Sequence, residues 1–335
     1  MTDQTASHES AFPLDSVGAR LRPLIPNRIR TALESRFPPL TPALVAERKT
    51  LHSHKGEALS YYVEKKVHGR PLVLIHSISA CASAYEMKPL FEHFREVRPT
   101  YAPDLPGFGF SERGARTYTP ELYVDELIEL LTRIKDKGDA PDVVAMSLSC
   151  EFVARVAATR KDLIHTLTFI SPTGLERSGD GHGHSAMRTV TSLGDTSHEP
   201  WWAKLAFGAI ASRPSIRYFL KKSFVGAVDE GLRDYAYTTS HQRGAEHAPM
   251  ALLRGSLFTK GIYDTYAKVD RPALVLYDRD GYVSFDRLPE LVASSPTWES
   301  KRLVPSLGMP QFERLEQTVE ALEEFWRSHG HAKHS

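Results

Sequence analysis

The sequence predicts an α/β protein, with a mostly parallel sheet, helices on both faces of the sheet, and a mainly helical insertion late in the chain. Three observations predict this fold. Short apolar runs alternate with helix-like segments from about residue 71 to 175, the alternation stops over 176–267, and it resumes over 268–328. Such alternation is typical of strands that pair in parallel through helical crossovers. With 335 residues, 41% of them hydrophobic, the chain can bury one large core and an attached subdomain.

The first part of the chain predicts an extension and a hairpin. Residues 1–45 are rich in proline and arginine and lack a clean hydrophobic period, so we interpret them as an extension, with a short amphipathic helix over 26–37. Strand-like runs on either side of Lys55 and Gly56 predict a hairpin. The run PLVLIH that follows is typical of a strand buried on both faces.

The next segments predict alternating strands and helices, with strands over 97–104, 141–146 and 163–172 and a helix over 149–160. The best-marked helix lies over 119–138. There Thr119 can cap the first turn, Pro120 takes the first helical position and Gly138 marks the end. Its apolar side chains recur at helical spacing, at Val124, Leu127, Ile128, Leu131 and Ile134.

After the insertion, strands and a closing helix are expected again. The strands are RPALVLYDRDG and KRLVP, and the helix is ERLEQTVEALEEFWRSH. The predicted organisation is therefore an extension at 1–45, a core at 46–175 and 268–328, the insertion at 176–267, and a tail at 329–335.

Charge and cysteine content restrict the function. There are 42 Lys and Arg residues against 41 Asp and Glu residues, which is not the balance of a nucleic-acid or anionic-membrane binder. Cys81 and Cys150 are too few for a disulfide framework and favour a reducing compartment. We see no secretory signal, and no apolar run near the roughly 18 residues of a membrane span. We expect a soluble, cytoplasmic protein that acts on a small apolar molecule without a cofactor.

Ser147 lies in VVAMSLSCEF, where a predicted strand passes into a predicted helix. This is the context of a nucleophile elbow, a strained turn that exposes a serine hydroxyl. The residues two before and two after must be small, because the strand and helix backbones pass close together, and Ala145 and Ser149 are small. The alternative interpretation is a serine at an ordinary turn.

Further landmarks follow in the order found in the α/β-hydrolase superfamily, which the chain resembles over about residues 71–175 and 268–328. The most specific is YAPDLPGFGFSERG, which is similar to the Asp-x-Pro-Gly-x-Gly-x-Ser loop of that family. LVLIHSISA resembles the strand and His-Gly that shape the oxyanion hole, and PALVLYDRDGYVS resembles the late strand whose following loop carries the acid.

The resemblance implies a serine hydrolase, in which a serine attacks a carbonyl, a histidine takes its proton, and an acid orients the histidine. The residues implied are Ser147 as nucleophile, Asp280 as acid, and the backbone N–H groups of Leu148 and of Ile78 or Ser77 as oxyanion donors. A solvated turn carboxylate is the alternative interpretation of Asp280, because another aspartate lies two residues before it.

The sequence departs from the family at three positions of the implied site. The histidine is expected just before the closing helix, where Gly308 stands, or Met309 if the alignment slides by one residue. Neither can accept a proton. The usual His-Gly is His76-Ser77, with His76 expected to be structural, and the glycines that flank the nucleophile are also replaced.

The base therefore stays unassigned. His241 and His247 are candidates because they lie in the insertion, which in this fold covers the elbow, and triads are defined by geometry rather than by chain order. The alternative is that both are ordinary polar or solvated histidines. His182 and His184, with Asp180, could bind zinc, but a loop of the insertion is the simpler interpretation, and we expect no metal.

Three functions are compatible with these residues. The first is hydrolysis of a small or medium, apolar ester or thioester through Ser147, with a non-standard or missing base. The second is a catalytically inactive hydrolase-fold protein that binds an apolar ligand or partner, because loss of a triad base costs roughly four to six orders of magnitude in kcat. The third is a lyase or transferase on the same fold. A histidine within about 3 Å of the Ser147 hydroxyl would favour the hydrolase.

Overall fold

The structure is a computed structural model, and it describes residues 37–53, 58–177 and 203–329. The chain divides into two compact units, Met1–Pro39 and Leu40–Ser335. The second unit contains every helix and strand that the structure describes. Most of the helix predicted over 26–37, the hairpin turn at Lys55 and Gly56, and the histidines at 182 and 184 lie outside the described residues.

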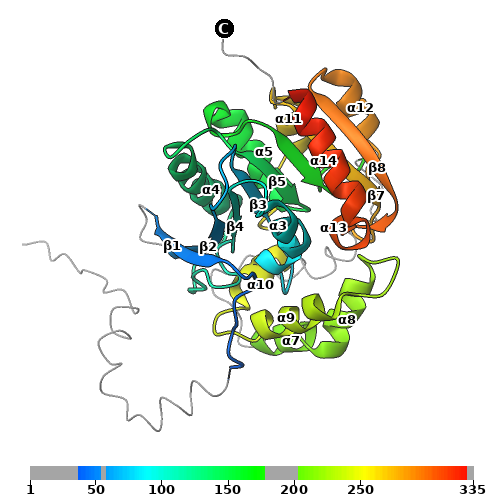
Figure 1. Ribbon diagram of the computed structural model, residues 1–335. Helices are drawn as coiled ribbons and strands as arrows, with labels where there is room; N and C mark the ends of the chain where they lie inside the picture. Colours follow the sequence, from blue (N-terminus) through cyan, green and yellow to red (C-terminus); the bar gives the residue numbers. More distant parts are fainter. Residues whose placement is uncertain (1–36, 54–57, 178–202, 330–335) are drawn as a thin grey trace, which may run out of the picture. The chain divides into compact units, whose positions relative to one another are not determined.

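An eight-stranded sheet forms the centre of this unit, in the order β1-β2-β4-β3-β5-β6-β7-β8 (Figure 1). The strands are β1 (Glu47–His52), β2 (Ala58–Glu64), β3 (Leu72–Ile75), β4 (Thr100–Pro103), β5 (Asp142–Met146), β6 (Leu167–Ile170), β7 (Ala273–Arg279) and β8 (Trp298–Leu307). The pairs β1–β2 and β2–β4 are antiparallel, and every pair from β4–β3 to β7–β8 is parallel. The predicted hairpin and mostly parallel sheet are confirmed.

The helices lie on both faces of the sheet. The core helices are η2 (Ala84–Met87), α3 (Lys88–Phe94), α4 (Pro120–Lys135), α5 (Ser149–Thr159), η3 (Lys161–Leu163), α12 (Leu288–Ser294), α13 (Pro310–Glu313) and α14 (Leu315–His329). Between β6 and β7 come α7 (Ala203–Ile210), α8 (Arg213–Lys221), α9 (Glu230–Ser240), α10 (His247–Leu253) and α11 (Ile262–Ala267). These helices form the predicted insertion after the sixth strand.

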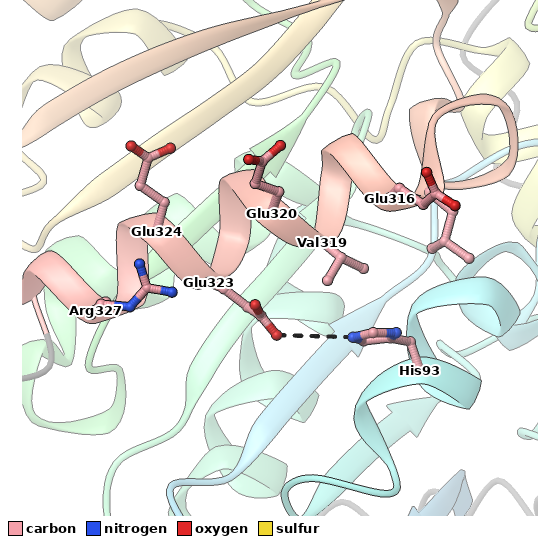
Figure 2. A pocket seen from close by; sticks show the side chains of 8 residues that line it. His93, Glu316, Val319, Glu320, Glu323, Glu324 and Arg327 are labelled. Atoms are coloured by element: carbon pink, nitrogen blue, oxygen red, sulfur yellow. Dashed lines mark ion pairs between the residues drawn. The ribbon is translucent and has the colours of Figure 1, made fainter.

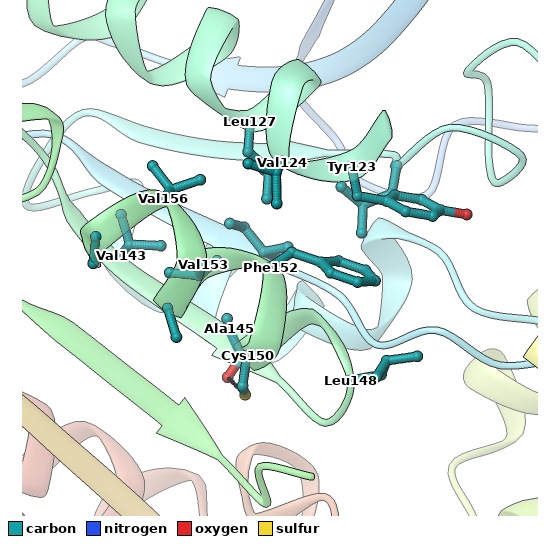
Figure 3. Close-up of a cluster of buried hydrophobic side chains, with 14 of the residues drawn as sticks. Tyr123, Val124, Leu127, Val143, Ala145, Leu148, Cys150, Phe152, Val153 and Val156 are labelled. Carbon is teal, nitrogen blue, oxygen red and sulfur yellow. Dashed lines mark hydrogen bonds between the residues drawn. The ribbon is translucent and has the colours of Figure 1, made fainter. Parts of the chain in front are cut away.

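Alternate residues of the central strands enter two separate hydrophobic cores. In β5, Val143 and Ala145 pack with residues of α4 and α5, whereas Val144 and Met146 pack with residues of α3 and α14. Side chains of a strand point alternately to the two faces, so a strand covered on both faces must be apolar at every position. Figure 3 shows the first core, with Phe152 of α5 beneath Tyr123 of α4, their rings stacked at 4.8 Å. These two cores fix the end of β5, where the chain turns into α5.

Several element boundaries differ from those predicted, among them the end of α4 and the start of β8. Thr119 caps α4 as expected, because its side chain accepts a hydrogen bond from the N–H of Leu122. The helix ends at Lys135 rather than near Gly138, since the N–H groups of Lys137 and Gly138 bond to carbonyls three residues back instead of four. Strand β8 begins earlier than predicted, at Trp298, and pairs with β7 from Ala273 onward. Among the described helices, none is long and apolar enough to cross a membrane.

Glu151 of α5 joins the two ends of the insertion. Its carboxylate accepts hydrogen bonds from the Thr173 hydroxyl, before the insertion, and from the Thr259 N–H near its end, at 2.8 Å. Burial raises the pKa of Glu151 to about 7, although these hydrogen bonds oppose the shift. The folded state therefore holds the proton more tightly than the unfolded state, and this group lowers stability as pH rises from about 4.5 to about 7.

Replacing Glu151 with glutamine is expected to remove this pH dependence, because an amide keeps one acceptor and cannot ionise. Relative to wild type, the variant should gain about 2–3 kcal/mol in the free energy of unfolding between about pH 5 and about pH 8. Urea unfolding of both proteins at the two pH values measures this gain. The same wild-type-to-variant difference at both pH values would contradict the assignment.

Candidate active site

Ser147 has the backbone geometry expected of an elbow. It follows β5 directly, and its φ of 55° lies in the left-handed region, which non-glycine residues rarely adopt. Its N–H donates to the Ile170 carbonyl of β6 at 2.9 Å, and its carbonyl accepts from the Cys150 N–H at 3.1 Å as α5 begins. Such strained positions persist only where the surrounding structure holds them, and they cluster at functional sites.

The residues that flank the elbow explain why glycine is not needed there. Ala145 and Ser149 are fully buried. The Ser149 hydroxyl donates to the His76 carbonyl at 2.6 Å, so it links the start of α5 to the loop after β3. A serine at this position therefore has a buried partner, and it holds the two loops of the site together.

His76 is structural and sets the direction of a neighbouring peptide group. Its Nε2 accepts a hydrogen bond from the Leu105 N–H at 2.9 Å, so its Nδ1 carries the proton and donates to the Ser77 carbonyl at 2.6 Å. Full burial lowers its pKa to about 4 and keeps the ring neutral. Because the peptide bond is trans, fixing the Ser77 carbonyl also fixes the opposite direction of the Ile78 N–H.

The structure distinguishes the two expected oxyanion donors of this loop. The Ser77 N–H is occupied, since it donates to Glu86 Oε2 at 2.7 Å, while the Ser77 hydroxyl donates to Oε1 at 3.0 Å. The backbone N–H groups of Ile78 and Leu148 have no acceptor among the residues that the structure describes, although both residues are buried. Ile78 and Leu148 are thus the pair with N–H groups free to bind an oxyanion.

Asp280 lies in the loop after β7. Its Oδ1 accepts hydrogen bonds from the N–H groups of Tyr282, at 2.7 Å, and Val283, at 3.3 Å. Burial raises its pKa to about 6, while these bonds and the Ser171 hydroxyl act in the opposite direction. Asp278 instead pairs with Arg302 Nε at 2.8 Å and with the Ser306 N–H at 3.0 Å. Asp278 therefore joins β7 to β8, and Asp280 remains the candidate acid.

Gly308 is the residue that faces this acid. It follows β8 with a φ of 64°, and a Cβ atom built on it would lie 2.7 Å from Asp280 Oδ2. Met309 is buried in the core between the sheet and α14. The position next to the acid is therefore 308, as the alignment on Pro310 predicts, and it carries no side chain.

The turn after α8 packs on the same loop. A Cβ on Gly308 would also lie 3.6 Å from Ser223 Cβ, and a Cβ on Gly281 would lie 2.9 Å from the Lys222 carbonyl oxygen. The Tyr282 hydroxyl also donates to the Phe219 carbonyl at 2.9 Å. These contacts explain how an acid on an exposed loop becomes desolvated.

Both candidate bases lie at helix boundaries in the insertion. His241 caps the end of α9, with Nδ1 bonded to the Tyr237 carbonyl at 2.7 Å and its ring against that of Tyr237. His247 opens α10, whose Ala248 packs on Gly107. Within the described ranges, no residue forms a hydrogen bond with the Ser147 hydroxyl, and no cluster of three metal-ligating side chains occurs.

Sequence reasoning missed Glu86 and Gln311. Glu86 lies in η2 with only 3% of its surface exposed, and Gln311 Nε2 donates to the Glu86 carbonyl at 3.1 Å and contacts Met146 Sδ at 3.3 Å. A glutamate in a short helix is usually exposed, so its sequence context gave no signal. The one hint in the sequence was the serine that replaces the usual glycine after His76.

One hollow on the surface is unrelated to these residues. It lies beside α14 and is lined mainly by glutamates of that helix, with His93 of α3 3.9 Å from Glu323 (Figure 2). None of the residues predicted for the site lines it.

Comparisons with known proteins identify the family and the fold. The family model described as the alpha/beta hydrolase family matches residues 72–321. No curated protein matches the sequence. Among solved structures, a serine hydrolase involved in carbazole degradation is similar, with 17% identity, a TM-score of 0.66, and coverage of 84% of this chain and 98% of that chain.

Other similar structures are a meta-cleavage product hydrolase from Pseudomonas fluorescens IP01 and a bromoperoxidase from Bacillus anthracis. The first has 14% identity and a TM-score of 0.65, and the match covers 84% of this chain and 97% of that one. The second has 17% identity and a TM-score of 0.65, with coverage of 84% and 100%. At such low identity these similarities concern the fold.

Proposed function

Since the chain belongs to the alpha/beta hydrolase family, we propose that it hydrolyses a small or medium, largely apolar ester or thioester through Ser147. The Ser147 oxygen attacks the carbonyl carbon, and the Leu148 and Ile78 N–H groups bind the oxyanion that forms. The alcohol or thiol leaves, an acyl-serine remains, and water then releases the acid. Asp280 is the acid or orienting group.

The observation that carries this proposal is the elbow itself. A serine in left-handed backbone, followed by a residue with an N–H lacking an acceptor among the described residues, is the arrangement that acyl transfer needs. The Ile78 N–H supplies a second donor from a different loop. Strained backbone of this kind clusters at functional sites, which supports the proposal.

The proton of Ser147 needs an acceptor other than residue 308. His241 and His247 are the candidates we propose within the insertion. Either would accept the proton after the insertion moves on substrate binding, since no described residue forms a hydrogen bond with the Ser147 hydroxyl in this structure.

The second candidate function is binding of an apolar ligand or partner without turnover. The specific observation in its favour is Gly308, which leaves Asp280 without the side chain that normally connects an acid to the nucleophile. The two functions differ in whether the Ser147 oxygen forms a covalent bond.

Acyl transfer from p-nitrophenyl esters and thioesters of increasing chain length tests the hydrolase. Wild type should gain the mass of the acyl group on the peptide that contains Ser147, because weak deacylation without a good base lets the intermediate accumulate. The Ser147→Ala variant should gain nothing on that peptide. An unmodified wild-type protein that still binds the esters would favour the binding function.

A further inference from the structure

We propose that Glu86 is a positioning residue for the oxyanion hole, and that, together with His76, it holds the loop of the Ile78 N–H most firmly when its carboxylate is ionised. The inference rests on the proposed function, since it assigns Glu86 a role in the same site. It begins from the two hydrogen bonds from Ser77 to the two oxygens of Glu86.

Both backbone groups of Ser77 are held by buried side chains. Glu86 holds the N–H, and His76 Nδ1 holds the carbonyl. The Ser77 carbonyl belongs to the same planar peptide unit as the Ile78 N–H. With both groups of Ser77 fixed, the direction of the Ile78 N–H follows, and this N–H is the oxyanion donor of the loop.

Glu86 is itself connected to the elbow. Gln311 of α13 donates to the Glu86 carbonyl and contacts the sulfur of Met146, the residue directly before Ser147. Gln311 is completely buried. Glu86 and Gln311 thus connect the loop of Ile78 to the elbow of Leu148, and they hold the two N–H donors at a fixed position relative to each other.

The contact between Ser77 and Glu86 also explains why a serine, and not the usual glycine of the family, follows His76. Ser77 is not in left-handed backbone, so glycine is not required by conformation at this position. Its hydroxyl instead donates the second hydrogen bond to the carboxylate. We interpret the serine as part of the Glu86 contact rather than as a weakened oxyanion loop.

Ionisation matters because each carboxylate oxygen accepts one hydrogen bond from Ser77. A protonated carboxyl keeps one full acceptor for the Ser77 N–H, but its bond to the Ser77 hydroxyl must reverse direction, and the charge that strengthens both bonds is lost. Burial raises the pKa of Glu86 to about 7, although the Ser77 hydrogen bonds lower it. Because the pKa of Glu86 is raised in the folded state, its carboxylate becomes mostly ionised only as pH rises through about 7.

Within the described part of the chain, no cation is a cause of the pKa shift of Glu86. The thiol of Cys81 interacts with it electrostatically from the same loop. Asp104, beyond β4, bonds to the Ala84 N–H, Tyr235 of α9 stacks on Tyr85, and α13 offers the neutral amide of Gln311. Lys88 of α3 pairs with Glu92. Desolvation therefore dominates the pKa.

The first test is the amide proton of Ser77, measured in wild type, Glu86→Gln and Ser77→Ala by two-dimensional ¹H–¹⁵N spectroscopy across pH. In wild type, the residue 77 amide should shift downfield as pH rises through about 7, because a charge-assisted hydrogen bond forms. Glu86→Gln should show no such step. Ser77→Ala should keep the step but move its midpoint to higher pH, since a bond that favours the ionised form is gone.

The second test is the rate at which Ser147 reacts with a fluorophosphonate. Wild type should react about tenfold faster than Glu86→Gln near about pH 8.5 and at a similar rate near about pH 5.5. The rate of wild type is divided by the rate of Glu86→Gln at each pH. Titration of other groups affects both proteins alike and cancels in this ratio.

The outcomes separate this inference from the proposed function. A residue 77 amide that does not titrate, or a rate ratio that is constant with pH, would overturn the role of Glu86 while labelling of Ser147 leaves the hydrolase in place. An amide that titrates in a protein that never reacts at Ser147 would support the link from Glu86 to the loop and overturn the hydrolase.

Discussion

Gly308→His is expected to react with a fluorophosphonate at Ser147 at least about 100-fold faster than Gly308→Ala near about pH 8, the range that general base catalysis supplies. Residue 308 faces Asp280 Oδ2, so an imidazole there can donate a hydrogen bond from one nitrogen and accept the serine proton on the other. The alanine variant is the matched control, because both variants place a Cβ in the same left-handed position.

Both substitutions have a cost in stability. Left-handed backbone costs a non-glycine residue roughly 1–2 kcal/mol, and the Cβ must displace Asp280 Oδ2 from 2.7 Å. Urea unfolding should show similar losses for the two variants, which makes their rates comparable. Equal reaction rates for histidine and alanine would contradict the assignment of position 308 to the missing base.

Gly109→Ala is expected to lower the free energy of unfolding by at least about 3 kcal/mol. Gly109 has a φ of 51°, and a Cβ on it would overlap the carboxyl group of Asp104. Asp104 cannot move without loss, because its oxygens accept hydrogen bonds from the N–H groups of Ala84 and Phe110, both at 2.9 Å. The change would therefore disturb the start of η2, which carries Glu86.

Gly138→Ala is the control for this prediction, since the space around Gly138 is open and its φ is not positive. It should change the unfolding free energy by less than about 0.5 kcal/mol. A Gly109→Ala protein as stable as this control would show that Asp104 does not hold the loop as the structure indicates.

Much of the fold could be predicted because it depends on local pattern. A strand buried on both faces is mostly apolar, so β3 and the greater part of β5 and β7 are visible as apolar runs. The end of α4 was predicted wrongly. Gly138, which suggested the end, lies beyond Lys135, the last residue of the helix.

The site was predictable where a single turn creates it. Ser147 could be placed at an elbow because the strand, the small neighbours and the helix are contiguous in sequence. The choice between Ile78 and Ser77 depends on Glu86, and the choice between Gly308 and Met309 depends on which residue faces Asp280. Both depend on contacts between distant segments, which a single sequence does not reveal.

The central claim is that Ser147 is a nucleophile, and fluorophosphonate labelling of the intact protein tests it most directly. We expect one modification in wild type, located by mass spectrometry on the peptide that contains Ser147, and none on that peptide in Ser147→Ala. Labelling is measured across a range of pH in which Asp280, whose burial raises its pKa to about 6, changes from protonated to ionised. A folded wild-type protein that stays unmodified across the whole pH range would contradict the claim and favour ligand binding without catalysis.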